Sequence, residues 1–301
     1  MASAIRELAV SGETAKVAAA VFDRTVQIWD LATREKVVEI ETVFSFGGSR
    51  LAIDAAGRKC IAAAWERGRY GGVACYEAAT GKLIWHRQDL HHTRRVRFSS
   101  SRGAVWCVPV QGAGPTRLLN AEGGQDIDSV AGVSGIFDSE HSRDLLVEKP
   151  NADYLLVNGK ARKIKRLTFT ILDAAFGTHT LLISESTGPL RCIECSTGIE
   201  SWRFVPEKGS HFLRVWFRKT DGNFYGVLWN YLNGNFLQLV RLDAATGEAK
   251  TICNLHSLEQ VYCAKLDCVV TSNGELIDLS NGAFLHRLEF PQWDSPQSHL
   301  A

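Results

Sequence analysis

The stretch Cys75-Tyr76-Glu77-Ala78-Ala79-Thr80-Gly81 carries the pattern that decides the fold. An apolar strand ends in an acidic residue, two small residues follow, and Thr80-Gly81 precedes a second apolar run, Leu83-Ile84-Trp85. Glycine after threonine allows the positive φ that a tight hairpin turn requires. The acidic side chain can accept hydrogen bonds from backbone amides in the same turn. The stretch therefore predicts two antiparallel strands joined by a short turn.

The same frame recurs along the whole chain. Clear copies end at Gly198, Gly247 and Gly282, weaker ones end at Gly124 and Gly159, and the first copy has Arg34 in place of glycine. If the residue four before this position is taken as an anchor, the anchors are 30, 77, 120, 155, 194, 243 and 278. Their mean spacing of about 41 residues is the length of a four-stranded propeller blade.

We therefore predict an all-β fold, a single β-propeller of about seven four-stranded antiparallel blades over residues 1–291, with a loose C-terminal tail at 292–301. The copies at 120 and 155 are degenerate, so six or eight blades are the alternatives. No segment has a sustained helical period, and we expect almost no helix.

Candidate strands can be placed within the units from their apolar alternation. The sixth unit predicts strands at 212–217, 224–229 and 236–242, with a short last strand ending at 253. The fifth predicts strands at 169–172, 180–184, 190–194 and 201–205. The first unit has its own leading strand at 5–10, and the last ends with a strand at 284–290. Both look complete, so we expect the ring to close by packing between the first and last blades.

Composition limits the classes of function. The 301 residues are 45% hydrophobic and 22% charged, as in a soluble globular protein, and a net charge of +1 does not favour a polyanion partner. No apolar run is long enough for a transmembrane helix, and Arg6 and Glu7 interrupt the start where a signal peptide would be apolar. We therefore expect a cytoplasmic protein that does not contact a membrane.

The eight cysteines are expected to be buried free thiols, as in a reducing compartment. Cys192 and Cys195 have the spacing of a zinc motif, but three residues apart on a strand they point to opposite faces. We expect no metal and no cofactor.

Two details resemble known propellers. The run Val26-Gln27-Ile28-Trp29-Asp30-Leu31 resembles the closing dipeptide of a WD repeat. Gly81-Lys82-Leu83-Ile84-Trp85 and Gly198-Ile199-Glu200-Ser201-Trp202 resemble the turn of a quinoprotein-type repeat. The chain thus resembles the WD-repeat and quinoprotein-like (PQQ-like) β-propeller superfamily over nearly its whole length.

This resemblance is specific for architecture. Trp-Asp ends a strand only once and the Gly-His dipeptide is absent, so the structural hydrogen-bond tetrad of WD repeats is not carried over. No Glu, Asn and Asp set matches the metal site of quinone-dependent dehydrogenases. The resemblance therefore implies no enzymatic activity.

In four-stranded blades, the loops between the second and third strands and the loops between blades lie on one face, by convention the top. Two second-to-third loops, at 65–72 and 229–235, combine Trp, Tyr and polar donors, which is typical of interface hot spots. The candidate partner-binding residues are Trp65, Arg67, Arg69 and Tyr70 in the first loop and Trp229 and Tyr231 in the second. The alternative is that each Trp ends a buried strand and packs between blades.

The segment 89–95 is predicted as an inter-blade loop on the same face, and it adds His91, His92 and Arg94 as candidates. His211 enters the next-to-last blade at a similar position. Paired His and Arg suit an acidic partner or a phosphate. The alternative is a solvated loop with one His hydrogen-bonded to a neighbouring blade.

The basic run Lys160-Ala161-Arg162-Lys163-Ile164-Lys165-Arg166 follows the Asn158-Gly159 turn. It predicts the outermost strand of its blade, where Lys and Arg prevent edge-to-edge pairing. Nucleic-acid binding is the alternative interpretation, and the net charge of +1 does not favour it.

The chain contains no Gly-x-Ser-x-Gly, His-Glu-x-x-His or phosphate-loop motif. We therefore expect a non-catalytic platform that binds another protein through its top-face loops, and a narrower hypothesis is an immunity-type binder that neutralises one partner. The alternative is an enzyme or small-molecule receptor with its site at the mouth of the central channel, where residues of seven blades converge without a linear motif. A shallow aromatic and charged rim would favour a protein partner, whereas a deep pocket of carboxylates or His would favour a ligand.

Overall fold

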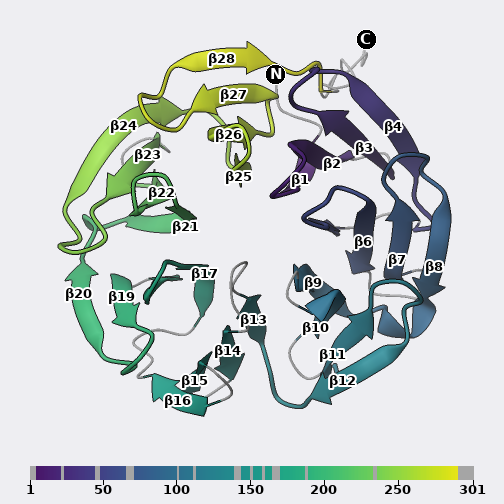
Figure 1. The fold of residues 1–301 in the computed structure, drawn as a ribbon, viewed down its shortest axis with the longest axis horizontal. Coiled ribbons are helices and arrows are strands. Elements are labelled where there is room, and N and C mark those ends of the chain that lie inside the picture. The colour runs from purple at the N-terminus through teal and green to yellow at the C-terminus, as the bar shows by residue number, and fades with distance from the viewer. Residues whose placement is uncertain are drawn as a thin grey trace, which may run out of the picture.

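The computed structural model describes residues 5–290, apart from 22–23, 45–47, 66–70, 100–101, 111–112, 139–143, 150–151, 158–159, 165–169, 187–188 and 233–235. These residues form seven four-stranded antiparallel sheets, arranged as blades around a central axis (Figure 1). The prediction of a seven-bladed all-β propeller is therefore confirmed. The predicted tail at 292–301 lies outside the described residues.

The strands follow one another blade by blade along the chain. The first three blades are β1 (Ile5–Val10), β2 (Lys16–Val21), β3 (Thr25–Asp30), β4 (Lys36–Glu41); β5 (Gly48–Ile53), β6 (Lys59–Trp65), β7 (Gly72–Glu77), β8 (Leu83–Arg87); and β9 (Thr93–Ser99), β10 (Ala104–Pro109), β11 (Thr116–Asn120), β12 (Asp126–Val130). The fourth and fifth are β13 (Gly135–Asp138), β14 (Leu145–Lys149), β15 (Ala152–Val157), β16 (Lys160–Ile164); and β17 (Ile171–Phe176), β18 (Thr180–Glu185), β19 (Leu190–Glu194), β20 (Glu200–Phe204). The last two are β21 (Ser210–Arg218), β22 (Asn223–Asn230), β23 (Phe236–Leu242), β24 (Ala249–Leu255); and β25 (Gln260–Cys263), β26 (Cys268–Thr271), β27 (Glu275–Asp278), β28 (Phe284–Arg287). A 3₁₀ turn, Gln88–Leu90, joins the second and third blades.

In each blade the first strand lies next to the axis and the fourth forms the outer wall (Figure 1). The strands of the sixth blade match the prediction closely. The first strand of the fifth blade does not, because its alternating burial begins at Ile171 and continues to Phe176, beyond the predicted 169–172. The basic run begins with β16, which is the outermost strand of the fourth blade, as predicted.

The repeated turn follows the third strand in six of the seven blades. In the second blade, the Gly81 N–H donates to the Glu77 carbonyl at 2.8 Å, and the Glu77 N–H donates to the Lys82 carbonyl at 2.9 Å. Gly81 has a φ of 74°, and Arg34 holds the equivalent position in the first blade at 68°. The turn therefore requires a residue in the left-handed conformation, which glycine adopts at the lowest energetic cost.

The fourth blade departs from the predicted frame. Position 155, the predicted anchor, lies inside β15, which continues until Val157 pairs with Lys160. The strand thus continues two residues past the predicted anchor. Residues 158–159 of that turn lie outside the described residues.

The turn glycine also receives the outer strand of the preceding blade. The Trp202 indole on β20 donates from Nε1 to the Ala244 carbonyl of the next blade at 2.8 Å. A Cβ added to Gly247 in that turn would lie 2.5 Å from the Trp202 ring. Trp85 and Gly124 repeat this contact between the second and third blades, with an Nε1 to Ala121 carbonyl distance of 3.1 Å.

The ring closes by packing between complete first and last blades, as predicted. Trp29 of β3 meets Phe290 edge to face, with ring centroids 5.7 Å apart. Val17 of the first blade and Val270 of the last belong to the same buried cluster. Neither blade exchanges a strand with the other.

All eight cysteines are free thiols, and seven of them are buried. Cys192 and Cys195 belong to different core clusters, as expected for residues on opposite faces of a blade. Burial raises the pKa of Cys75, Cys107 and Cys195 to about 12, so these thiols are protonated at neutral pH. Within the described ranges, no helix is long and apolar enough to span a membrane.

The contact between Trp202 and Gly247 predicts the cost of one methyl group. Gly247→Ala should cost about 1–2 kcal/mol for the positive φ and a further ~1–3 kcal/mol for displacing the indole. Gly222→Ala is the matched control, because Gly222 has a similar φ of 69° and open space around it. Urea unfolding of both variants measures the difference, and equal losses would show that the indole can move away freely.

Candidate functional site

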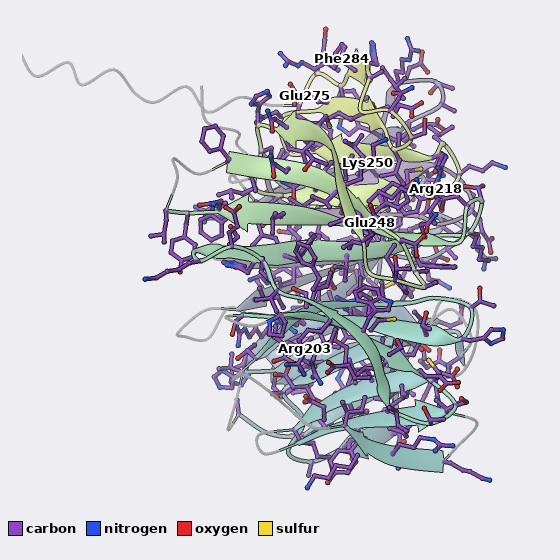
Figure 2. All side chains as sticks on the ribbon, turned by 90° about the vertical axis from the view of Figure 1, so that its left-hand side faces the viewer. Arg203, Arg218, Glu248, Lys250, Glu275 and Phe284 are labelled. Atoms are coloured by element: carbon purple, nitrogen blue, oxygen red, sulfur yellow. The ribbon has the colours of Figure 1, made fainter. Side chains whose placement is uncertain are left out.

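The two ends of the ring carry different loops. Figure 2 views the wall from the side and labels Arg218 and Glu248, which lie at the end that carries the first-to-second and third-to-fourth turns. The opposite end is the top face, which carries the second-to-third and inter-blade loops. The predicted partner-binding residues that can be described lie in blades three and six of this face.

Three aromatic side chains meet at the top of the sixth blade. His211 at the start of β21 lies across from Trp229 near the end of β22, with ring centroids 5.1 Å apart. Tyr231 follows β22 and lies 5.7 Å from Trp229 and 6.0 Å from His211, between ring centroids. The sequence placed all three on the same face, and the structure brings them into one cluster.

Exposed apolar side chains extend this cluster. Tyr231, Leu232 and Phe236 are 51%, 57% and 58% exposed. The Tyr231 N–H donates to the carbonyl of Gly209 at 3.0 Å, and Leu232 lies against Gly209. These contacts hold the loop against the start of β21. We call the five residues His211, Trp229, Tyr231, Leu232 and Phe236 the blade-6 patch.

The blade-6 patch has little charge of its own. Burial lowers the pKa of His211, so its imidazole is neutral at pH 7. The indole N–H of Trp229 is buried and has no acceptor among the described residues.

The position of Trp229 fits the alternative interpretation, in which it packs between blades, and its contact with a partner stays a prediction. Its indole packs beside the core cluster between blades six and seven, and it also supports the exposed Tyr231. Trp65 ends β6, but its side chain and residues Arg67, Arg69 and Tyr70 lie outside the described residues. Their contact with a partner stays a prediction.

His91 and His92 follow the 3₁₀ turn, and their ring centroids are 4.0 Å apart. Neither imidazole has a hydrogen bond to any residue in the described ranges, so the predicted bond to a neighbouring blade is not found there. The prediction that 89–95 is a loop was wrong at its end. Strand β9 begins at Thr93, because Arg95 pairs with Val108 of β10, and Arg94 therefore lies on an inner strand. This group enters blade three, and the blade-6 patch lies elsewhere on the ring (Figure 1).

The sequence analysis missed a set of charged side chains on the inner strands. Three ion pairs join different blades: Glu7 with Arg50 at 2.7 Å, Arg97 with Asp173 at 3.2 Å, and Arg214 with Glu259 at 3.1 Å. Partners are 43 to 76 residues apart in the chain, so no linear motif contains them. The available signal was weak and consisted of charged residues within or beside several of the leading strands. In the part of the chain that the structure describes, no three His, Cys, Asp or Glu side chains converge as a metal site would require.

Comparison with known proteins supports the architecture. No family model matches the sequence, and no curated protein matches it. The structure of U3-55K is similar, with a TM-score of 0.67 and 10% identity over 89% of this chain and 88% of that chain. At this identity the likeness shows the seven-bladed propeller fold alone. Since 1569 chains of solved structures are similar, the fold does not select one function.

The neutral state of His211 predicts a pH dependence. Its pKa in the folded protein lies below the unfolded value of about 6.5, so the folded state binds fewer protons and loses stability as pH falls through this range. We expect His211→Gln to lose less unfolding free energy than wild type between pH 7.5 and 5.5, measured by urea titration. His86 also has a lowered pKa, but it is present in both proteins. The difference between their losses of unfolding free energy therefore reports on His211. Equal losses in both proteins would contradict the expectation.

Proposed function

We propose that this chain is a non-catalytic platform that binds another protein, and that the blade-6 patch is part of the contact surface. The observation that carries the proposal is the exposure of Tyr231, Leu232 and Phe236, each more than half accessible, around a cluster of aromatic rings. Aromatic residues are enriched at interface hot spots. Exposed apolar side chains that gather in one place are typical of interaction sites.

The support of the patch also favours this function. β21 and β22 pair continuously from Ser210–Asn230 at the top to Arg218–Asn223 at the other end. Tyr231 comes directly after β22, and Phe236 is the first residue of β23. Side chains at strand ends lose little additional freedom on binding, so more of the contact energy contributes to affinity.

The alternative is an enzyme or a small-molecule receptor at the mouth of the channel. A general acid or base must be free to exchange a proton with its substrate. In the described part of the channel, Glu7, Asp173 and Glu259 are each paired with an arginine. Burial raises the pKa of Glu259, but Arg214 opposes that shift. These pairings favour a structural role for these three carboxylates.

A narrower form of the proposal is that binding neutralises one partner, as an immunity protein does. It rests on the same surface and adds a consequence for the partner. The partner's own activity, measured with and without a stoichiometric amount of this chain, tests it. Loss of that activity in the complex supports neutralisation, whereas unchanged activity leaves only the binding platform.

Site-specific crosslinking tests the platform. A photoreactive phenylalanine analogue at position 231 should give one stoichiometric protein adduct in lysate of the native host, because this position lies on the exposed rim. Phe284 is the matched control, since it is 61% exposed but lies on the outer wall in β28 (Figure 2). The adduct should disappear when Trp229→Ala and Phe236→Ala are added. Similar adducts at both positions, or none at 231, would refute the proposal.

A further inference from the structure

We propose that the central channel holds a binding site for a compact oxyanion, a phosphate or carboxylate group, and that Arg95 on β9 is the residue that contacts it. The site lies in the third blade and shares no residue with the blade-6 patch. The inference therefore does not depend on the proposed protein partner.

Arg95 differs from other arginines of the inner strands in lacking a carboxylate partner among the described residues. Arg50, Arg97 and Arg214 each have a carboxylate oxygen within 3.2 Å. Arg95 differs from them, because no carboxylate of a described residue lies within 4 Å of its guanidinium and no hydrogen bond to that group is formed in the described ranges. The guanidinium of Arg95 thus has five N–H donors, and none of them has an acceptor among the described residues.

The neighbouring carboxylates are already engaged. Asp173 pairs with Arg97, and its second oxygen accepts the Val215 N–H at 3.1 Å. Glu148 is almost completely buried, and one of its oxygens accepts the Ile171 N–H at 3.2 Å. Neither side chain can turn to Arg95 without leaving a buried N–H without an acceptor.

The surroundings of Arg95 disfavour its charge. Burial lowers the pKa of Arg95 to about 10, and the positive charges of Arg97 and Arg94 act in the same direction. Glu148 and Asp173 favour the charge but do not compensate. Arg95 and Arg97 both lie beside the ring of Phe137, with their guanidinium carbons 5.9 and 4.8 Å from its centroid. A partly buried cation beside a second cation costs stability unless an anion joins them.

This arrangement is suited to an oxyanion. Guanidinium groups bind phosphate and carboxylate oxygens through paired, charge-assisted hydrogen bonds. Arg94, one residue earlier on β9, is exposed and adds positive charge where the strand begins. A compact anion at this point would supply the acceptor that Arg95 lacks and would reduce its repulsion with Arg97.

The test compares wild type with Arg95→Met in thermal unfolding at constant ionic strength, in sodium chloride, sodium phosphate and sodium acetate. A ligand that binds only the folded state raises the midpoint with its concentration. We expect wild type to be stabilised by phosphate, by acetate or by both, and the two arms distinguish the preferred oxyanion. In Arg95→Met, the apparent affinity should fall about tenfold or more, as expected for a lost hydrogen bond to a charged group.

Two features separate a binding role from a structural one. In chloride alone, Arg95→Met should be at least as stable as wild type, because an unpaired, partly buried cation has been removed. Arg203→Met is the matched control, since Arg203 on β20 pairs with Glu200 at 2.8 Å on the outer wall (Figure 2) and should keep the wild-type response to phosphate and acetate.

Two results would overturn the proposal. In the first, neither phosphate nor acetate raises the unfolding midpoint of wild type above its value in chloride. In the second, the midpoint of Arg95→Met rises with the anion as much as that of wild type. If Arg95→Met does not fold, Arg95→Lys decides, because it keeps the charge and removes the paired donors. Isothermal titration of inorganic phosphate or acetate, whichever stabilises wild type, should then show at least several-fold weaker binding to Arg95→Lys, and unchanged binding would refute the site. Crosslinking at position 231 is unaffected by either result.

Discussion

The contact between the outer strand of one blade and the turn of the next is the constraint from which the rest of the ring follows. A four-stranded sheet has two apolar faces, and in a propeller both are covered only by neighbouring blades. Trp202 and Trp85 fix this docking at two of the junctions, because each indole lies against a turn glycine and donates to a carbonyl beside it. The turn thus sets the backbone reversal within its own blade and the position of the blade before it.

The axis of the ring is held in a different way. The first strand of each blade has a hydrogen-bonded neighbour on one side only, and such edges are prone to unwanted pairing. Here charged side chains on these strands pair with those of other blades, as Arg97 of the third blade does with Asp173 of the fifth. These pairs connect strands that share no backbone hydrogen bonds. The guanidinium of Arg95 has no carboxylate partner among the described residues, and for that reason we propose an anionic ligand for it.

The two candidate sites differ in polarity and in their position on the ring. The blade-6 patch is apolar, lies at the ends of long paired strands and presents Tyr231 and Phe236 outward. The Arg95 site is cationic and half enclosed, and its neighbours come from strands of several blades. A rigid ring can carry both at once, because its blades hold the rim and the channel at a fixed separation.

From the sequence alone we could predict the repeat, a propeller of about seven blades, the outermost position of β16 and the opposite faces of Cys192 and Cys195. These features follow from local physics: a positive φ at Gly81, hydrogen bonds within four residues, and side-chain alternation along a strand. The same local frame failed at position 155, where strand pairing to Val157 overrode it. The tertiary structure was needed to show which inner-strand charges pair, and that no carboxylate of a described residue pairs with Arg95. Partners such as Glu7 and Arg50 are 43 residues apart, and the packing of the first blade against the second brings them together.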